Sequence, residues 1–363
     1  MNQMLNTASA TTVMAAQIGG EIPFTLDADG RINVNAARPF LDEDGETRII
    51  TNAEGDSRLV TNAGLLQYQE WLEIDRAVTQ TANLRLTGIA DLRGRGLTHS
   101  LGSIGQTVSL WDAVSSMTPA QIDMAGITPG QEDTIAYAPT QVPVPIVHKD
   151  FRLNLRRLQA SRMFGESVDV TAASVASRLV AEASERMLFG GKAIKVDGGT
   201  IYGYRTFPSR AQVDRTADWP SATPAQIKGD VQAMLTAARA RRFYGPFSLY
   251  IPPEWEGVLD EYYLVGDDTA GITSVGLTIR QALLALSGLE EIKVADFMGA
   301  SGEAVMVQMT RDVVDLAVAQ DVTTLSWSAM GGMQEHFKVM AVWVPRLKAD
   351  FDGRCGIVHL RPA

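Results

Sequence analysis

The stretch VPVPIVHKDFRLNLRRL constrains the fold of this chain more than any other part of the sequence. Pro143 and Pro145 lack the backbone N–H that a central strand must donate, so this part can only be a strand edge or a junction. Farther along, Phe151, Leu153 and Leu155 alternate with polar residues, which is the period-two pattern of a half-exposed strand. We expect one face of this strand to be buried and the other to be cationic.

The composition is that of a folded protein. A chain of 363 residues with 45% hydrophobic residues can bury a large core in one elaborate domain or two. Its apolar runs fall short of the roughly 18 residues needed to cross a bilayer. The first twenty residues lack a basic segment, so we expect no secretory signal and an intracellular start. The single cysteine, Cys355, cannot form an internal disulfide, and the four scattered histidines offer no zinc spacing.

The charge is unevenly distributed. Residues 1–148 hold 17 Asp or Glu against 8 Arg and no Lys, so nearly all of the net charge of −10 lies in this part. A protein that reads DNA sequence usually carries a basic excess or stripe. Sequence-specific DNA binding is therefore disfavoured, while loose contact with nucleic acid stays open.

Local patterns indicate helices and strands in a mixed order. The first sixty residues predict two hairpins, around Asp29-Gly30 and around Gly55. Residues 65–86 have the apolar spacing of an amphipathic helix. Residues 87–141 are rich in Gly, Thr, Ser and Pro and contain one possible short helix, TPAQIDMAG.

The second half of the chain alternates before it becomes strand-rich. Residues 168–191 predict a long helix that ends at two glycines. Thr223 and Gln226 form the capping box of a further helix. Strands crowd the C-terminal part, so the predicted class is α+β. The apolar face expected on the long helix consists of Ala172, Val175, Leu179, Ala183 and Met187.

No residue pattern in the chain predicts catalysis. His148 has no nucleophile tied to it by a motif, and Cys355 lies in a strand pattern where a small buried residue is expected. We therefore expect no catalytic, cofactor-binding or metal-binding residues, and not an enzyme. Arg239, Arg241 and Arg242 follow one another at a helix end, where they suit the helix dipole and could equally face an acidic neighbouring chain.

The order of the elements resembles a known family. WLEIDRAV in a helix is followed by a long loop, the proline-led strand PVPIVHKDFRLNLRRL, and a long helix that ends in MLFGG. IYGYRTF, a TP-capped helix, GPFSLYIPPEW and a strand-rich end come next. From about Leu65 to Leu360 this order resembles the encapsulin-like branch of tailed-bacteriophage major capsid proteins, which have the Hong Kong 97 fold.

The resemblance implies a division of the chain into six parts. These are an N-terminal arm at 1–64, an amphipathic helix at 65–86, an extended loop at 87–145 that lies over an adjacent subunit, a peripheral domain with its spine helix at 146–194, an axial domain at 195–318, and C-terminal strands at 319–363 that return to the peripheral domain.

The same resemblance implies a structural function. The first hypothesis is a major capsid protein that self-assembles into pentamers and hexamers of an icosahedral virion shell in the host cytoplasm. That shell would enclose double-stranded phage DNA without sequence specificity, with decoration, portal and scaffold proteins as further partners. The alternative is an encapsulin, a shell around a cargo enzyme. An enzyme with an unrecognised site is a third option, and no membrane role is expected.

Five residues are candidates for contacts between subunits. Arg152, Arg156 and Arg157 would face acidic groups on an adjoining subunit, and Tyr68 and Trp71 lie on the first helix. Some capsids of this fold join subunits covalently through a loop lysine and an asparagine. The first lysine of this chain is Lys149, so residues 87–145 cannot provide that lysine, and we expect no such bond.

Overall fold

The computed structural model describes the chain in segments. They are residues 25–26, 32–33, 40–41, 47–50, 57–59, 68–120, 122, 124, 132–164, 170–265, 273–298, 302–330 and 333–362. Most of the arm expected at 1–64 lies outside them. Its described part consists of β1 (Thr25–Leu26) paired with β2 (Ile32–Asn33), and of β3 (Phe40–Leu41), β4 (Thr47–Ile50) and β5 (Ser57–Leu59) in one small antiparallel sheet. These pairings confirm both predicted hairpins.

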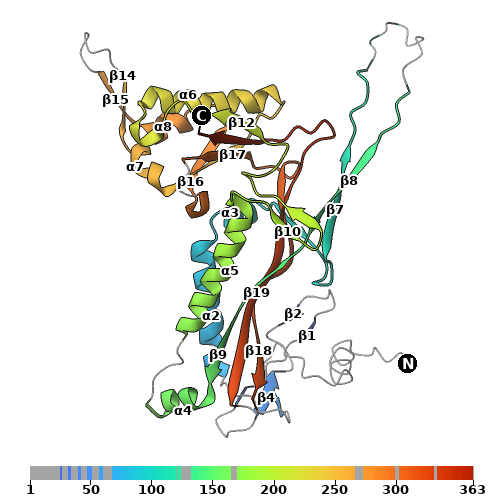
Figure 1. The fold of residues 1–363 in the computed structure, drawn as a ribbon, viewed down its shortest axis with the longest axis vertical. Helices are drawn as coiled ribbons and strands as arrows, with labels where there is room; N and C mark the ends of the chain where they lie inside the picture. The colour runs from blue at the N-terminus through green and yellow to red at the C-terminus, as the bar shows by residue number, and fades with distance from the viewer. Residues whose placement is uncertain are drawn as a thin grey trace.

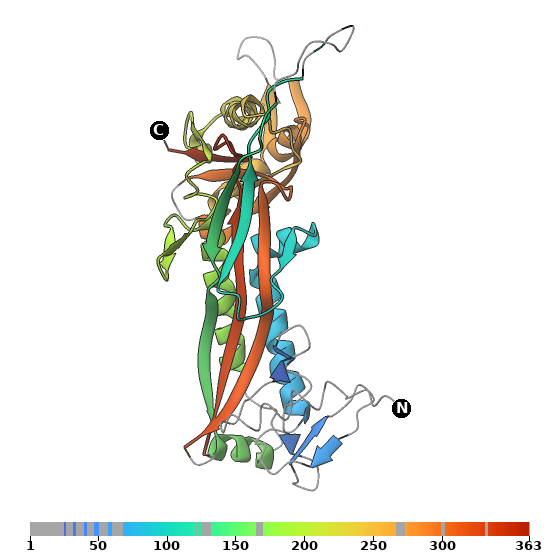
Figure 2. The ribbon, with the colours of Figure 1, turned by 90° about the vertical axis from the view of Figure 1, so that its right-hand side faces the viewer.

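A four-stranded sheet runs along the molecule and is called the stem sheet here (Figures 1 and 2). Its long central strands pair antiparallel with one another, and the strand predicted from the opening stretch forms one edge. In spatial order the strands are β6 (Thr98–Ser100), β18 (Val314–Ala329), β19 (Gln334–Leu347) and β9 (Ile146–Asn154).

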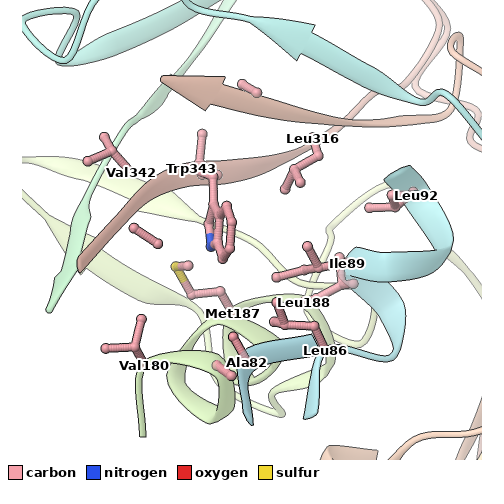
Figure 3. Close-up of a cluster of buried hydrophobic side chains, with 14 of the residues drawn as sticks. Ala82, Leu86, Ile89, Leu92, Val180, Met187, Leu188, Leu316, Val342 and Trp343 are labelled. Carbon is pink, nitrogen blue, oxygen red and sulfur yellow. The ribbon is translucent and has the colours of Figure 1, made fainter. Parts of the chain in front are cut away.

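Two long helices pack against each other and against the stem sheet, α2 (Tyr68–Arg85) and α5 (Thr171–Phe189). Figure 2 shows them behind the strands. Trp343 of β19 lies in the core between sheet and helices, next to Met187 and Ile89 (Figure 3). Its indole N–H donates to the Ser184 hydroxyl of α5 at 3.0 Å, which satisfies the one polar atom of a fully buried ring.

The apolar face predicted for α5 is wrong at most of its positions. Val175 and Leu179 are 41% and 38% exposed, whereas Met187 is buried as expected. The helix instead buries a face of small residues, which lets α2 approach closely, and the Ser177 hydroxyl donates to the Val78 carbonyl at 2.6 Å. Apolar periodicity alone could not find this face because alanine and serine weigh little in such a pattern. The small buried residues are Ala173, Ala176, Ser177, Ala181 and Ser184.

The edge strand β9 ends one residue earlier than the alternation suggests. Phe151 and Leu153 are half-buried against the stem core, and the Phe151 ring stacks on Phe337 at 4.8 Å between centroids. Leu155, however, begins the short helix α4 (Leu155–Phe164). The Asn154 side chain accepts the Arg156 backbone N–H at 2.9 Å, the local bond with which asparagine starts a turn.

A second sheet forms the upper part of the molecule in Figure 1 and is called the upper sheet. Helices α6 (Pro224–Ala240), α7 (Glu256–Leu259) and α8 (Ile279–Leu284) pack around its own hydrophobic core. The predicted capping box of α6 is confirmed, since Thr223 and Gln226 bond each other's backbone N–H. In spatial order the strands are β12 (Ala211–Asp214), β20 (Ile357–Arg361), β17 (Ala304–Gln308), β13 (Phe247–Ile251) and β16 (Leu289–Val294).

Among the described residues, two further short strand pairs and three 3-10 helices lie outside the stem sheet and the upper sheet. β10 (Ile194–Val196) pairs with β11 (Gly199–Ile201), and β14 (Tyr262–Val265) pairs with β15 (Thr273–Thr278). Short 3-10 helices lie at Trp219–Ser221, Pro253–Trp255 and Asp296–Met298. None of the described helices combines the length and hydropathy needed to cross a bilayer.

The C-terminal strands do not all return to one place. The sequence predicts that 319–363 joins the region of the spine helix, and β18 and β19 do lie there. The last strand, β20, instead pairs with β12 and β17 in the upper sheet. The prediction is wrong for this strand because Ile357, Val358 and Leu360 could be buried in either sheet, and only the tertiary fold distinguishes the two.

A short helix joins the stem to the upper sheet, α3 (Gly88–Gly94). The buried Glu185 carboxylate of α5 accepts the backbone N–H groups of Gly88 and Ile89 at 3.1 and 3.0 Å. On the other side, Asp91 accepts bonds from Tyr250 of β13 and Lys293 of β16. A Cβ on Gly88 would lie 2.5 Å from the Phe189 ring, so only glycine permits this contact. Two carboxylates therefore connect α3 with α5 and with the upper sheet.

The buried Glu185 carboxyl beside α3 predicts a pH dependence of the free energy of unfolding. Burial raises the pKa of Glu185 from 4.5 to about 7. The folded chain thus binds this proton more tightly than the unfolded chain, and stability falls as pH rises from the unfolded pKa towards 7. We expect a loss of about 3 kcal/mol across that window. Glu185→Gln cannot titrate, so chemical denaturation near pH 5 and near pH 8 should show a smaller fall than in the wild type. Equal falls in both proteins would contradict the assignment.

Candidate subunit interface

A two-stranded antiparallel ribbon leaves the stem and runs up beside the upper sheet (Figures 1 and 2). It consists of β7 (Val108–Val114) and β8 (Tyr137–Pro143) and is called the ribbon here. The loop expected at 87–145 is therefore too long, because 88–100 contributes α3 and β6 to the body of the molecule.

The short helix predicted from TPAQIDMAG is not seen in the described residues of that stretch. Thr118, Pro119 and Ala120 are not helical. The Thr118 backbone N–H instead donates to the Asp133 carboxylate at 2.6 Å, and this bond ties the two arms of the ribbon together beyond its paired part. A Thr-Pro start alone does not make a helix, because a short helix needs tertiary packing to be stable.

One face of the ribbon carries uncovered apolar side chains beside the polar Asp112 and Gln141. Leu110 and Tyr137 are 63% and 65% exposed, and Val114, which lies directly opposite Tyr137, is 49% exposed. Directly opposite residues in a ladder point to the same side, so these side chains share one surface. Exposed apolar groups gathered on one face are typical of a contact with another protein.

The ribbon also carries an unpaired strand edge. The Ser115 N–H donates to the Ala136 carbonyl at 2.9 Å and the Val144 N–H to the Thr107 carbonyl at 2.8 Å. This register turns the N–H and C=O groups of Val108, Leu110, Asp112 and Val114 away from β8. No other strand of the described segments pairs with β7. On β8 the outward positions include Pro139 and Pro143, so only the β7 edge can accept a further strand.

A buried ion pair holds the root of the ribbon. Arg346 of β19 binds both carboxylate oxygens of Asp315 on β18 at 2.5 Å, and Lys348 adds a bond of 2.7 Å. The remaining guanidinium N–H groups reach the Ser109 hydroxyl of β7 at 3.2 Å, and the Trp111 ring lies 5.8 Å away. The base of the ribbon is thereby fixed to the stem sheet while its outer part projects.

The three predicted arginines belong to β9 and α4, at the other end of the stem from the upper sheet (Figure 1). Arg152 on β9 and Arg156 and Arg157 on α4 are all exposed. The α4 sequence, LRRLQASRMF, contains three arginines and no acidic residue. Within the described segments, Arg152 and Arg156 make no ion pair. We call Arg152 and the exposed residues of α4 the β9–α4 surface.

The other two candidates are placed differently. Trp71 is 4% exposed, and its ring lies 5.5 Å from that of Phe337 inside the stem core. As an interface residue it is a wrong prediction, because its surface is already used within the subunit. Tyr68 is the first residue of α2, and its side chain lies outside the described part of the molecule.

The exposed residues of the ribbon and of α5 were not among the sequence candidates. A signal existed in the ribbon, where Leu110, Asp112 and Val114 alternate with Ser109 and Trp111. That alternation predicts a strand but does not say which face meets the body of the subunit. For α5, the exposed Val175 and Leu179 have the normal spacing of a core face, so their exposure can be recognised only in the fold.

The polar groups that could carry chemistry are dispersed. Burial raises the pKa of the Cys355 thiol to about 12, so it stays protonated and unreactive. His148 lies 3.5 Å from Asp150 on an exposed strand edge. In the described segments, no three His, Cys, Asp or Glu residues are grouped as metal ligands.

Comparisons with known proteins agree with the architecture. The type 1 encapsulin shell protein EncA of Myxococcus xanthus (strain DK1622) is 28% identical over 292 residues, which cover 78% of this chain and 90% of EncA. The virus-like particle from Pyrococcus furiosus is similar in structure, with a TM-score of 0.57 and 18% identity over 81% of this chain and 99% of its own. The capsid of Myoviridae phage XM1 has a TM-score of 0.57 and 10% identity over 76% and 92%.

These structural similarities confirm the Hong Kong 97 fold and the encapsulin-like resemblance expected from the sequence. Residues 61–360 match the model of a family of unknown function, DUF6260, and this match spans most of the chain. The chain therefore belongs to the DUF6260 family and has the Hong Kong 97 fold.

Proposed function

We propose that this chain is the subunit of a self-assembling protein shell. The observation that carries the proposal is the ribbon, which presents an apolar face and an unpaired strand edge that its own subunit leaves uncovered. A single copy of the chain would expose this surface to water, whereas a closed lattice of copies can bury every one of them. The similarity to a virus-like particle, a phage capsid and an encapsulin shell protein supports the same conclusion.

Within such a shell, the ribbon of one copy lies on the β9–α4 surface of the next. Between Arg95 and Lys149 the chain contains four Asp or Glu residues and no Lys or Arg, so the segment that includes the ribbon and the loop beyond it is acidic. The β9–α4 surface is basic, and the outer edge of β9 is unpaired in the described segments, as is that of β7. Opposite charge and two available strand edges favour contact between copies.

This contact predicts the effect of reversing two charges. Arg152→Glu combined with Arg156→Glu should prevent assembly, because the basic surface would then repel the acidic ribbon. Folding should be unaffected, since both side chains are exposed. Sedimentation velocity would report assembly and thermal unfolding would report stability. Lys192→Glu, at an exposed site outside the surface, is the matched control. Normal particles from the double variant would rule out this contact.

The specific function that we propose is that of a major capsid protein. Pentamers and hexamers would form an icosahedral virion shell in the host cytoplasm, around double-stranded phage DNA that the wall does not read. Decoration, portal and scaffold proteins would be further partners. The support is the phage capsid similarity together with the long segment ahead of the matched residues 61–360, which fits an arm that reaches a neighbour. Because residues 87–145 lack lysine, this shell is held by non-covalent contacts.

An encapsulin shell around a cargo enzyme is the second candidate, favoured by the similarity to EncA over 90% of its length. The contents of particles purified from the native source distinguish the two. Nuclease-protected double-stranded DNA of uniform length would support the capsid, and one enriched enzyme inside nucleic-acid-free particles would support the encapsulin. Failure of the full chain to form any large particle would contradict both.

A further inference from the structure

Helix α6 ends at a group of arginines, and only some of them form hydrogen bonds within the subunit. The guanidinium of Arg241 donates to the Ser209 carbonyl at 2.6 Å, and that of Arg239 donates to the Ser287 carbonyl at 2.7 Å. The exposed Arg242 side chain makes no hydrogen bond or ion pair within the described segments. Tyr244, two residues later, is 69% exposed. We call Arg239, Arg242 and Tyr244 the basic end.

The Arg242 side chain is exposed, and its backbone has a strained conformation. Its φ is +69°, the left-handed conformation in which helices usually end on glycine. The backbone N–H groups of Arg242 and Phe243 close the helix at Arg239 and Ala238, and a glycine could make the same bonds without strain. An arginine in this position contributes nothing to the fold of its own subunit beyond a favourable charge at the helix C-terminus. Such a strained residue points to a role outside the subunit.

A complementary group lies on α7 and its flanks. Glu254, Glu256, Asp260 and Glu261 are all exposed, and they share a single cation. Arg280 lies 3.2 Å from Asp260 and 3.8 Å from Glu256. Glu254 and Glu261 form no ion pair in the part of the chain that the structure describes. We call the four carboxylates together with the 66% exposed Tyr262 the acidic end.

The two ends lie at opposite sides of the upper sheet. The chain leaves the basic end at Tyr244, crosses the sheet along β13 and reaches the acidic end at Glu254. Five strand residues span roughly 16 Å, so the two groups cannot neutralise one another within one copy. Opposite charges on the two ends favour a contact between the basic end of one copy and the acidic end of another. A head-to-tail contact brings unlike charges together, and it closes a ring if the rotation between copies is regular.

We infer that the basic end of one copy binds the acidic end of the next copy, and that this head-to-tail contact closes the rings from which the shell is built. The inference rests on the proposed shell function and names the contact within a ring, which is distinct from the ribbon contact. Arg242 meets the carboxylates, and the two exposed tyrosines provide the apolar area around the ion pairs.

Charge exchange tests this contact. Arg242→Glu alone and Glu261→Arg alone should each raise the protein concentration required for ring formation on the order of a hundredfold, because like charges then face each other. The double variant restores opposite charges at every contact and should assemble at nearly the wild-type concentration. Native mass spectrometry and sedimentation would give the ring size and the threshold.

Mixing the two single variants shows that the contact is between copies. The reversed end of one variant is complementary to the reversed end of the other, so the mixture should form even-numbered rings, such as hexamers, in which the two variants alternate. Neither protein should form rings alone at the same concentration. Arg242→Gly relieves the backbone strain and should fold at least as stably as the wild type, yet assemble less well. If wild-type shells form and none of these variants changes assembly, the ring contact is wrong while the shell function stands. Absence of wild-type shells would instead contradict the shell function.

Discussion

Replacing Asp315 with asparagine is expected to destabilise the subunit by about 3 to 5 kcal/mol, the cost of leaving a buried charge without its partner. The Arg346 side chain is 5% exposed and binds both oxygens of this carboxylate, so it has no route to water when the charge is removed. Chemical denaturation of the full chain at concentrations below assembly would measure the loss. The root of the ribbon should also loosen, since the same arginine holds Ser109.

An exposed pair provides the matched control for this substitution. Arg361 and Asp214 form an ion pair in which both side chains are about half exposed. Asp214→Asn should cost less than about 1 kcal/mol, because water already solvates both groups. Equal losses from the two substitutions would contradict the role given to burial at Asp315.

Placing lysines on the outer face of the ribbon is expected to abolish shell assembly without unfolding the subunit. Leu110→Lys with Val114→Lys removes two exposed apolar side chains and adds positive charge where the ribbon meets the basic β9–α4 surface. Like-charge contact of this kind costs several kcal/mol, and lysine on a strand edge also blocks pairing. The variant should sediment as small species at concentrations that give wild-type particles.

The free energy of unfolding distinguishes a loss of assembly from misfolding. Both side chains already face solvent, so the free energy of unfolding should change by less than about 0.5 kcal/mol. Leu110→Met with Val114→Ile keeps the face apolar and should assemble normally. Shells of normal size from the lysine variant would show that the ribbon is not part of the interface.

The sequence predicted correctly those features that depend on residues close together in the chain. The capping box at Thr223 and Gln226, the glycine stop after α5 and the half-buried Phe151 and Leu153 all depend on neighbours within a few residues. The order of these elements also gave the Hong Kong 97 fold. Arg152, Arg156 and Arg157 are exposed on a strand and on the helix that follows it, and their role in a subunit contact stays a prediction.

The remaining errors concern contacts between distant segments. Helix α5 buries alanine and serine rather than Val175 and Leu179, since the closeness of α2 selects for size and not for hydropathy. Trp71 fits an interface by composition, yet Phe337, more than 250 residues away, covers it. The apolar face of the ribbon and the ends of the upper sheet become visible only when the position of every strand is known.

Electron cryomicroscopy of the purified full-length chain tests the central claim most directly. The account predicts closed icosahedral particles in which the ribbon of each subunit lies over the β9–α4 surface of a neighbour. A small oligomer of defined size that never closes into a shell under assembly conditions, with the ribbon exposed to solvent, would contradict it.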